Sequence, residues 1–282
     1  MLEFRGERLD FNVADDEDFM QHLNRYAFAK PFCTGSVLDL ACGVGYGTYF
    51  LSDKTDISTI VGGDISEEAI KYAQATFANN KTHFQLESAT KTTFTNNSFN
   101  TIISIETVEH IKEIDIFFTE ATRLLNENGT FIMSLPNKKF FLDEGFENAF
   151  HFNEMYYSEL NIFLSTYFKK NEMYYQFYPI ERYNRIHPKL NAQKTVVAKK
   201  NIRSFIPLPL KQFIGPIIKH LNYSKLSKNS VREIYGFEFQ KFLDNNSNLR
   251  DQYRIVPIEE QIYNKIPGNF MAVCQGAKQR LR

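Results

Sequence analysis

Two aspartates bracket a glycine-rich stretch early in the chain. Asp39 ends a short apolar run and is followed by ACGVGYG at residues 41–47, and Asp64 ends a second apolar run further along. Glycines let a backbone approach a ligand closely, and a carboxylate at a strand end can accept hydrogen bonds from both hydroxyls of a ribose. Because a carboxylate beside the turn repels a pyrophosphate and attracts a cation, the pattern predicts a site for a positively charged nucleoside.

The spacing of Gly43, Gly45 and Gly47 is G-x-G-x-G, which differs from the G-x-G-x-x-G of a dinucleotide site. An oxidoreductase that uses a dinucleotide is therefore disfavoured. Taken by themselves, glycines between a strand and a helix can also serve packing alone.

A second group of residues could move a proton. His110 follows the fourth predicted strand, with Glu109 before it, and His151 comes after the fifth. Histidine accepts a proton near neutral pH, so we expect His110 to be the catalytic base, Glu109 to orient it and His151 to be the second candidate. The alternatives are that the Glu-His pair caps a helix or anchors a loop, and that His151 only binds a substrate hydroxyl.

No metal is expected from the sequence. The Asp, Glu and His residues show no convincing ligand spacing, and the three cysteines, Cys33, Cys42 and Cys274, lie far apart. We expect these cysteines to be reduced thiols.

The elements that must position these residues alternate between strands and helices. Apolar runs predict strands at 36–40, 58–63, 83–87, 101–105, 130–135, 172–177 and 269–275, and helical spacing predicts helices at 18–30, 66–78, 114–125 and 153–167. This order predicts an α/β fold with a doubly wound, mostly parallel seven-stranded sheet. The carboxyl ends of its strands would carry the aspartates and the histidines.

Charge divides the 282-residue chain near residue 178. Residues 1–178 carry a net charge of −12, whereas residues 179–232 carry +11. We therefore predict a core at 1–178, a basic insertion or substrate subdomain at 179–268, and a last core strand with a tail at 269–282. Within the insertion, 201–221 mixes apolar and basic residues with three prolines. It could lie on an anionic membrane, hold a phosphate-bearing acceptor, or dock on the acidic core.

Composition excludes several classes of protein. Hydrophobic residues make up 43% of the chain, which excludes global disorder, and the net charge of zero gives no sign of a nucleic-acid binder. No apolar stretch is long enough to span a bilayer and the first residues lack a signal-peptide pattern. We expect a cytoplasmic protein, with peripheral contact to the inner face of the membrane through 201–221 as an option. The sequence leaves the oligomeric state undecided.

Several motifs resemble those of class I S-adenosylmethionine-dependent methyltransferases, which have a Rossmann-like fold. VLDLACGVGYG (37–47) and VGGDIS (61–66) are similar to the first two motifs of that family, and FTNNSFNTIISIETVEHIKE (94–113) and LLNENGTFIMSLPN (124–137) to the later ones. HLNRYAFA (22–29) and NAFHFNEMYYSEL (148–160) more loosely resemble the members that act in surface-polysaccharide and O-antigen biosynthesis.

The resemblance implies a role for each matching residue. The methionine part of S-adenosylmethionine would contact the glycine turn. Its ribose would bind to Asp64, and its adenine would contact Ile65, Ser88 and Ala89. Arg25, with Tyr26 beside it, could pair with the carboxylate of the donor, or Arg25 could be an ordinary solvated residue. Glu106 could face the sulfonium or accept structural hydrogen bonds. The implied cofactor-binding residues are Arg25, Tyr26, Asp39, Ala41, Gly43, Gly45, Asp64, Ile65, Ser88, Ala89 and Ile105.

The resulting hypothesis is an enzyme that methylates a sugar hydroxyl in a polysaccharide or in its nucleotide- or lipid-linked precursor. A methyltransferase for a small phenol, quinone or carboxylate is the first alternative, because one core serves many acceptors. A cofactor-binding module without catalysis is the second.

Overall fold

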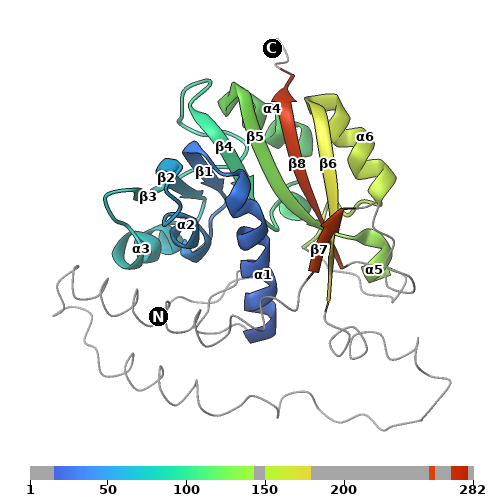
Figure 1. The fold of residues 1–282 in the computed structure, drawn as a ribbon, viewed down its shortest axis with the longest axis horizontal. Coiled ribbons are helices and arrows are strands. Elements are labelled where there is room, and N and C mark those ends of the chain that lie inside the picture. Colours follow the sequence, from blue (N-terminus) through green and yellow to red (C-terminus); the bar gives the residue numbers. More distant parts are fainter. Residues whose placement is uncertain (1–15, 143–149, 179–253, 258–267, 279–282) are drawn as a thin grey trace, which may run out of the picture.

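The computed structural model describes residues 16–142, 150–178, 254–257 and 268–278. Figure 1 shows an eight-stranded sheet in the order β3-β2-β1-β4-β5-β8-β6-β7, with β3 and β7 at its edges. The strands are β1 (Gly35–Leu40), β2 (Ile57–Asp64), β3 (Thr82–Leu86), β4 (Phe99–Ser104), β5 (Leu125–Pro136), β6 (Phe168–Phe177), β7 (Arg254–Pro257) and β8 (Asn269–Ala277). The helices are α1 (Asp16–Ala29), α2 (Tyr46–Leu51), α3 (Glu67–Thr76), α4 (Ile114–Leu124), α5 (Lys138–Leu142) and α6 (Tyr157–Tyr167), with short 3-10 turns η1 (Lys30–Phe32) and η2 (Val108–His110).

The first five strands are parallel, so their carboxyl ends meet at one edge of the sheet. β8 lies antiparallel between β5 and β6, so the C-terminal strand predicted at 269–275 belongs to the core sheet. The predicted count of seven strands is wrong, because β7 adds an eighth, antiparallel to β6. β7 falls inside 179–268, so part of the expected insertion belongs to the sheet.

Helices cover both faces of the sheet, as a doubly wound fold requires. Successive residues of β1 point to opposite faces: Val37 packs in one core cluster with residues of α1, α2 and α3, and Leu38 in another with residues of α4 and α6. Both side chains are fully buried. Burial on both faces explains why the strands appear in the sequence as continuous apolar runs instead of alternating patterns.

Local capping decides where two of the helices begin. The hydroxyl of Ser66 accepts a hydrogen bond from the backbone N–H of Ala69 and so caps α3, which lies within the helix predicted at 66–78. The helix expected from residue 153 begins later, at Tyr157, because the Glu159 carboxylate accepts the backbone N–H of Tyr156. Asn153 lies before the helix and donates through its side-chain amide to the carbonyl of Ile111.

The remaining predictions about the insertion, including its boundary at residue 178 and the segment 201–221, lie outside the described residues. Within the described residues, the helices are too short or too polar to cross a bilayer. All three cysteines are buried free thiols, as expected.

Candidate active site

The glycine turn, residues 41–47, connects β1 to α2 at the carboxyl edge of the sheet. Ala41, Gly43 and Gly45 all have positive φ angles, of 67°, 57° and 88°. At Gly45 a Cβ atom would lie 2.6 Å from the ring of Phe84, so both the backbone conformation and the packing require glycine there. The backbone N–H groups of Ala41 and Cys42 donate to the carbonyl of Gly63 at 2.7 and 3.0 Å. The turn is therefore fixed to the end of β2.

Asp64 lies at the end of β2 beside the glycine turn. Its Oδ2 accepts the backbone N–H of Gly43 at 2.9 Å, and its Oδ1 accepts that of Ser66 at 2.8 Å. These bonds orient the carboxylate between the turn and the start of α3. Because each carboxylate oxygen can accept more than one hydrogen bond, Asp64 can also accept hydroxyl groups of a ligand.

Asp39 lies beneath the glycine turn and is fully buried, instead of facing an open crevice. Its carboxylate accepts hydrogen bonds from the hydroxyls of Thr48 at 2.6 Å and Tyr26 at 3.2 Å. Burial raises the pKa of Asp39 to about 7, against the lowering effect of these hydrogen bonds. Tyr26 is buried as well, and its ring fills the space that a Cβ atom at Gly47 would need. Asp39 and Tyr26 thus support the turn from within the protein.

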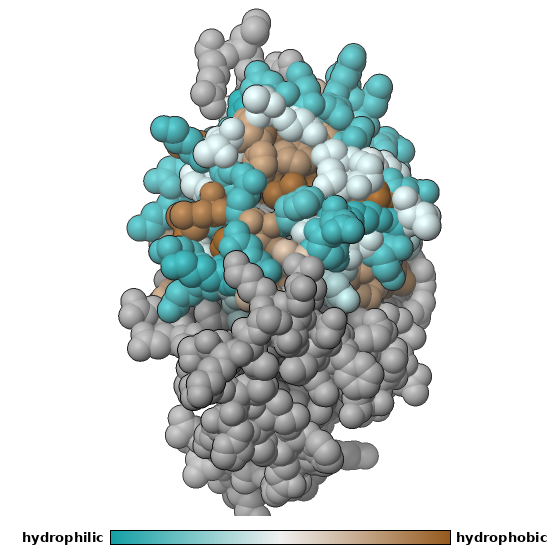
Figure 2. Space-filling view, turned by 90° about the vertical axis from the view of Figure 1, so that its left-hand side faces the viewer, coloured by the Kyte–Doolittle hydropathy of each residue, from teal (hydrophilic) through white to brown (hydrophobic). Residues whose placement is uncertain are grey.

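Apolar surface flanks Asp64 on the side expected to hold an adenine ring. Ile65 is 74% exposed, and Leu86, which is in register with Asp64 on the neighbouring strand, is 54% exposed. Figure 2, which views the side of the molecule where β3 and α3 lie, shows apolar patches among hydrophilic residues. Ser88 and Ala89 follow β3 and are half-buried, with the Ser88 hydroxyl 3.1 Å from that of Thr90.

Two further residues belong to this half of the site and carry no motif signal in the sequence. Thr48 binds Asp39 from the first turn of α2, and Leu86 ends the strand beside Asp64. Aligning the ends of the predicted strands 58–63 and 83–87 would place Ser88 beside Asp64, so the pairing of Asp64 with Leu86 needed the observed register.

Arg25 is almost fully buried in a polar network at the same edge of the sheet. Its Nε donates to Gln176 at 2.8 Å, and its NH1 lies 3.4 Å from the carboxylate of Glu106. Glu106 also accepts hydrogen bonds from Ser134 and Asn269. Arg25 is therefore not a solvated residue, and Glu106 acts as a structural hydrogen-bond acceptor next to the buried Ile105 at the end of β4.

The histidine cluster consists of Glu109, His110 and His151, the three residues considered for catalysis. One ligand-type atom of each lies within 4.8 Å of the others, and the two imidazole rings are 5.1 Å apart in an edge-on arrangement. The backbone N–H of Phe152 donates to the carbonyl of Glu109 at 2.6 Å, which ties the two chain segments together. The three side chains lie close enough for one ion to contact an atom of each, a grouping that their spacing in the sequence did not predict.

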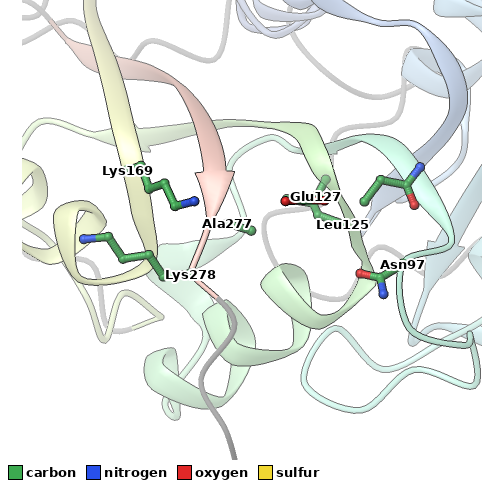
Figure 3. Close-up of a pocket in the computed structure, with 7 residues that line it drawn as sticks. Asn97, Leu125, Glu127, Lys169, Ala277 and Lys278 are labelled. Carbon is green, nitrogen blue, oxygen red and sulfur yellow. The ribbon is translucent and has the colours of Figure 1, made fainter.

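The glycine turn and the histidine cluster follow strands β1 and β4, which are neighbours in the parallel sheet. Both therefore lie at its carboxyl edge, where ligands bind in open α/β sheets. A shallow pocket lined by Asn97, Leu125, Asn126, Glu127, Lys169, Ala277 and Lys278 lies at the opposite edge (Figure 3). That pocket contains none of the predicted site residues.

Solved structures share this fold. YcgJ from Bacillus subtilis aligns with a TM-score of 0.51 at 17% identity, covering 92% of this chain and 99% of that one. A SAM-dependent methyltransferase from Archaeoglobus fulgidus also aligns with a TM-score of 0.51, at 14% identity, covering 93% and 95%.

Curated relatives match parts of the chain. A probable S-adenosylmethionine-dependent methyltransferase of Mycolicibacterium smegmatis is 26% identical over 58% of this chain and 64% of its own length. The ubiquinone biosynthesis O-methyltransferase of Pelagibacter ubique is 30% identical over 39% and 45%. Phosphoethanolamine N-methyltransferase 1 of Arabidopsis thaliana is 30% identical over 35% and 20%. The chain thus spans less than two thirds of the length of each of these relatives.

A family model described as a methyltransferase domain matches residues 34–185, which include the glycine turn, Asp64 and the histidine cluster. Since this match covers more than half of the 282 residues, the chain belongs to the methyltransferase domain family.

Proposed function

We propose that this protein transfers a methyl group from S-adenosylmethionine to a hydroxyl oxygen of its acceptor. The observation that carries the proposal is the placement of a nucleoside-type cradle and a pair of histidines at one edge of a parallel sheet. Membership of the methyltransferase domain family supports it.

The described residues fit such a donor. The backbone N–H bonds to Asp64 orient a carboxylate for the ribose hydroxyls, and the exposed side chains of Ile65 and Leu86 offer apolar surface to the adenine. Arg25 is already paired with Glu106, so we assign the amino and carboxylate ends of the donor to backbone groups of the glycine turn. When bound, S-adenosylmethionine supplies an electrophilic methyl group on a sulfonium, and the protein positions the acceptor behind it.

His110 is the proposed proton acceptor. Its Nδ1 lies 3.1 Å from the carbonyl oxygen of Phe150, which can only accept a hydrogen bond, so Nδ1 carries the proton and Nε2 the lone pair. The imidazole is 34% exposed and can reach a bound acceptor. Nε2 takes the hydroxyl proton while the acceptor oxygen bonds to the methyl carbon, and the electrons of the broken C–S bond return to sulfur.

The surroundings of the cluster favour a sugar acceptor that carries phosphate. Phe150, Phe152 and Tyr156 expose 59%, 52% and 39% of their surface beside His151 in the chain. Aromatic faces of this kind pack against the apolar face of a sugar ring. Lys112 and Lys138 lie over the rings of Phe152 and Tyr156, at 4.9 and 5.3 Å, and place positive charge beside them. The acceptor we propose is a sugar hydroxyl in a nucleotide- or lipid-linked polysaccharide precursor.

A small phenol or quinone is the second candidate acceptor. The similarity to ubiquinone biosynthesis O-methyltransferases favours it, and exposed aromatic side chains suit a planar ring as well as a sugar.

The test is incubation with methyl-labelled S-adenosylmethionine and two sets of acceptors, nucleotide-sugars with glycan extracts and small phenols with quinols. Label in a sugar supports the first proposal, and label only in phenols or quinols selects the second. The exposed His83 on β3 supplies the matched control, because His83→Ala should transfer label like the wild type. Donor binding with no transfer to either set would contradict the proposed activity and leave a non-catalytic binding module.

A further inference from the structure

Both histidines of the cluster have a fixed tautomer. His110 Nδ1 faces the Phe150 carbonyl at 3.1 Å, and His151 Nδ1 faces the carboxylate of Glu154 at 2.8 Å. A carbonyl and an ionised carboxylate accept hydrogen bonds but donate none. Each Nδ1 therefore carries the proton, and the lone pair of each neutral imidazole is on Nε2.

The lone pair of His110 lies close to a buried carboxylate. Glu109 is 1% exposed, and its Oε1 lies 4.0 Å from Nε2 of His110. With one ligand-type atom of His151 included, the set spans at most 4.8 Å. One nitrogen of each imidazole and a carboxylate oxygen thus lie in a space small enough for one cation to contact all three, and the negative charge of the carboxylate attracts a cation.

The framework around the cluster holds the ligands in place. The Glu109 carbonyl accepts the backbone N–H groups of Phe152 and Asn153, and the Asn153 side chain donates to the carbonyl of Ile111. The Nδ1 bonds to Phe150 and Glu154 are the outer hydrogen bonds that accompany metal-binding histidines, since they fix the ring orientation and raise the basicity of the other nitrogen.

We propose that Glu109, His110 and His151 bind one divalent first-row transition-metal ion. Two imidazoles and one carboxylate are ligands that Zn²⁺ and Mn²⁺ accept, whereas Mg²⁺ prefers oxygen ligands alone. Around a metal at about 2.1 Å the ligand atoms would stand roughly 3 to 4 Å apart, so the cluster needs to close only slightly. Three protein ligands leave positions for an acceptor oxygen.

The role of this ion in catalysis rests on the proposed function, but its binding does not. A metal-bound hydroxyl loses its proton more easily than a free one. A bound ion would make His110 a ligand and would favour loss of the acceptor hydroxyl proton to solvent, while the acceptor oxygen bonds to the methyl carbon and the electrons of the C–S bond return to sulfur. Without the ion, His110 accepts that proton itself.

Isothermal titration calorimetry on the full chain, stripped of metal by a chelator, tests the proposal with ZnCl₂, MnCl₂ and MgCl₂ in separate titrations. We expect one site for Zn²⁺ and Mn²⁺ and much weaker binding of Mg²⁺. His110→Ala and His151→Ala should weaken Zn²⁺ and Mn²⁺ binding by at least about 100-fold, and Glu154→Ala by about 10- to 100-fold. His83→Ala should bind like the wild type.

Equal metal affinity in the wild type, His110→Ala and His151→Ala, or no binding to the wild type, would overturn the inference. Heat on titration with S-adenosylhomocysteine confirms that each variant is folded, and Glu109→Gln replaces any variant that is not. Methyl transfer that persists in chelator-treated protein with no metal site would leave the proposed function standing without the ion. A metal site in a protein that methylates none of the acceptors would support the metal site and contradict the proposed function.

Discussion

The donor half of the site, made of the glycine turn and Asp64, is held together differently from the acceptor half, the histidine cluster. In the donor half, backbone groups make the connections: the turn donates to the Gly63 carbonyl and to the Asp64 carboxylate. In the acceptor half, side chains from two distant segments meet, with His110 on a 3-10 turn after β4 and His151 after α5.

This difference separates binding from chemistry. The turn keeps its backbone N–H groups when a side chain is replaced, whereas the histidine cluster loses a proton acceptor or a ligand with each of its side chains. We therefore expect substitutions in the acceptor half to lower turnover and substitutions in the donor half to lower affinity for the donor.

The largest effect is expected at His110. His110→Ala should lower kcat by about 10²- to 10⁴-fold, because the substrate hydroxyl loses the base that takes its proton, or the metal ion that would bind its oxygen. Steady-state kinetics with labelled donor measures the effect, with His83→Ala as the control. A kcat within experimental error of the wild type would contradict the claim that the histidine cluster carries the chemistry.

Asp64 should show the opposite kinetic signature. Asp64→Ala removes the acceptor for the ribose hydroxyls and for the N–H groups of Gly43 and Ser66, so KM for the donor should rise by about 10- to 100-fold with kcat nearly unchanged. Asp53, which is 72% exposed on the surface, is the control position. A loss confined to kcat would place Asp64 in the acceptor half instead.

Asp39 makes stability depend on pH in the donor half. Burial raises its pKa to about 7, so between about pH 4 and 7 the folded state holds a proton that the unfolded state has released. The free energy of unfolding therefore falls as pH rises through this window. Because Asp39→Asn does not titrate, the Tm of the wild type relative to this variant should fall by roughly 2 to 6 °C between pH 5 and pH 8.

Thermal scans at several pH values measure the Tm of the wild type and of Asp39→Asn. Asp56→Asn, at an exposed position, is the control. Parallel pH profiles for the wild type and Asp39→Asn would show that the buried carboxyl carries no such cost.

The smallest effect is expected at Ile65. Its side chain is 74% exposed, so Ile65→Ala should change the free energy of unfolding by less than about 0.5 kcal/mol. Donor affinity should nevertheless fall by about 3- to 10-fold, through the loss of apolar contact with adenine. Ile162, 69% exposed on α6, is the matched control, and equal donor affinity in Ile65→Ala and Ile162→Ala would exclude Ile65 from the site.

Much of the fold could be predicted because its signals are local. Continuous apolar runs identified the first five parallel strands, and helical spacing identified α3 to within a residue at its start. β7 was missed because RIVP is a run of only four residues inside 179–268, the segment expected to form a separate insertion. Its pairing with β6 is a long-range contact that no local pattern reports.

In the site too, the parts set by local sequence could be predicted and the parts set by long-range contacts could not. The positions of the glycine turn and Asp64 follow from one short motif and the end of the next strand. The meeting of His110 with His151 depends on how the segment after α5 returns to the sheet, so the sequence named both residues without predicting their contact. The burial of Asp39 under Thr48 and Tyr26 also needed the three-dimensional packing.

Calorimetric titration of S-adenosylhomocysteine into the wild type, Asp64→Ala and His110→Ala tests the central claim most directly. We predict that the wild type binds this product, that His110→Ala binds it within about twofold of the wild type, and that Asp64→Ala binds it at least about 10-fold more weakly. No heat with the wild type, or a loss in His110→Ala as large as that in Asp64→Ala, would contradict a donor cradle that is separate from the histidine cluster.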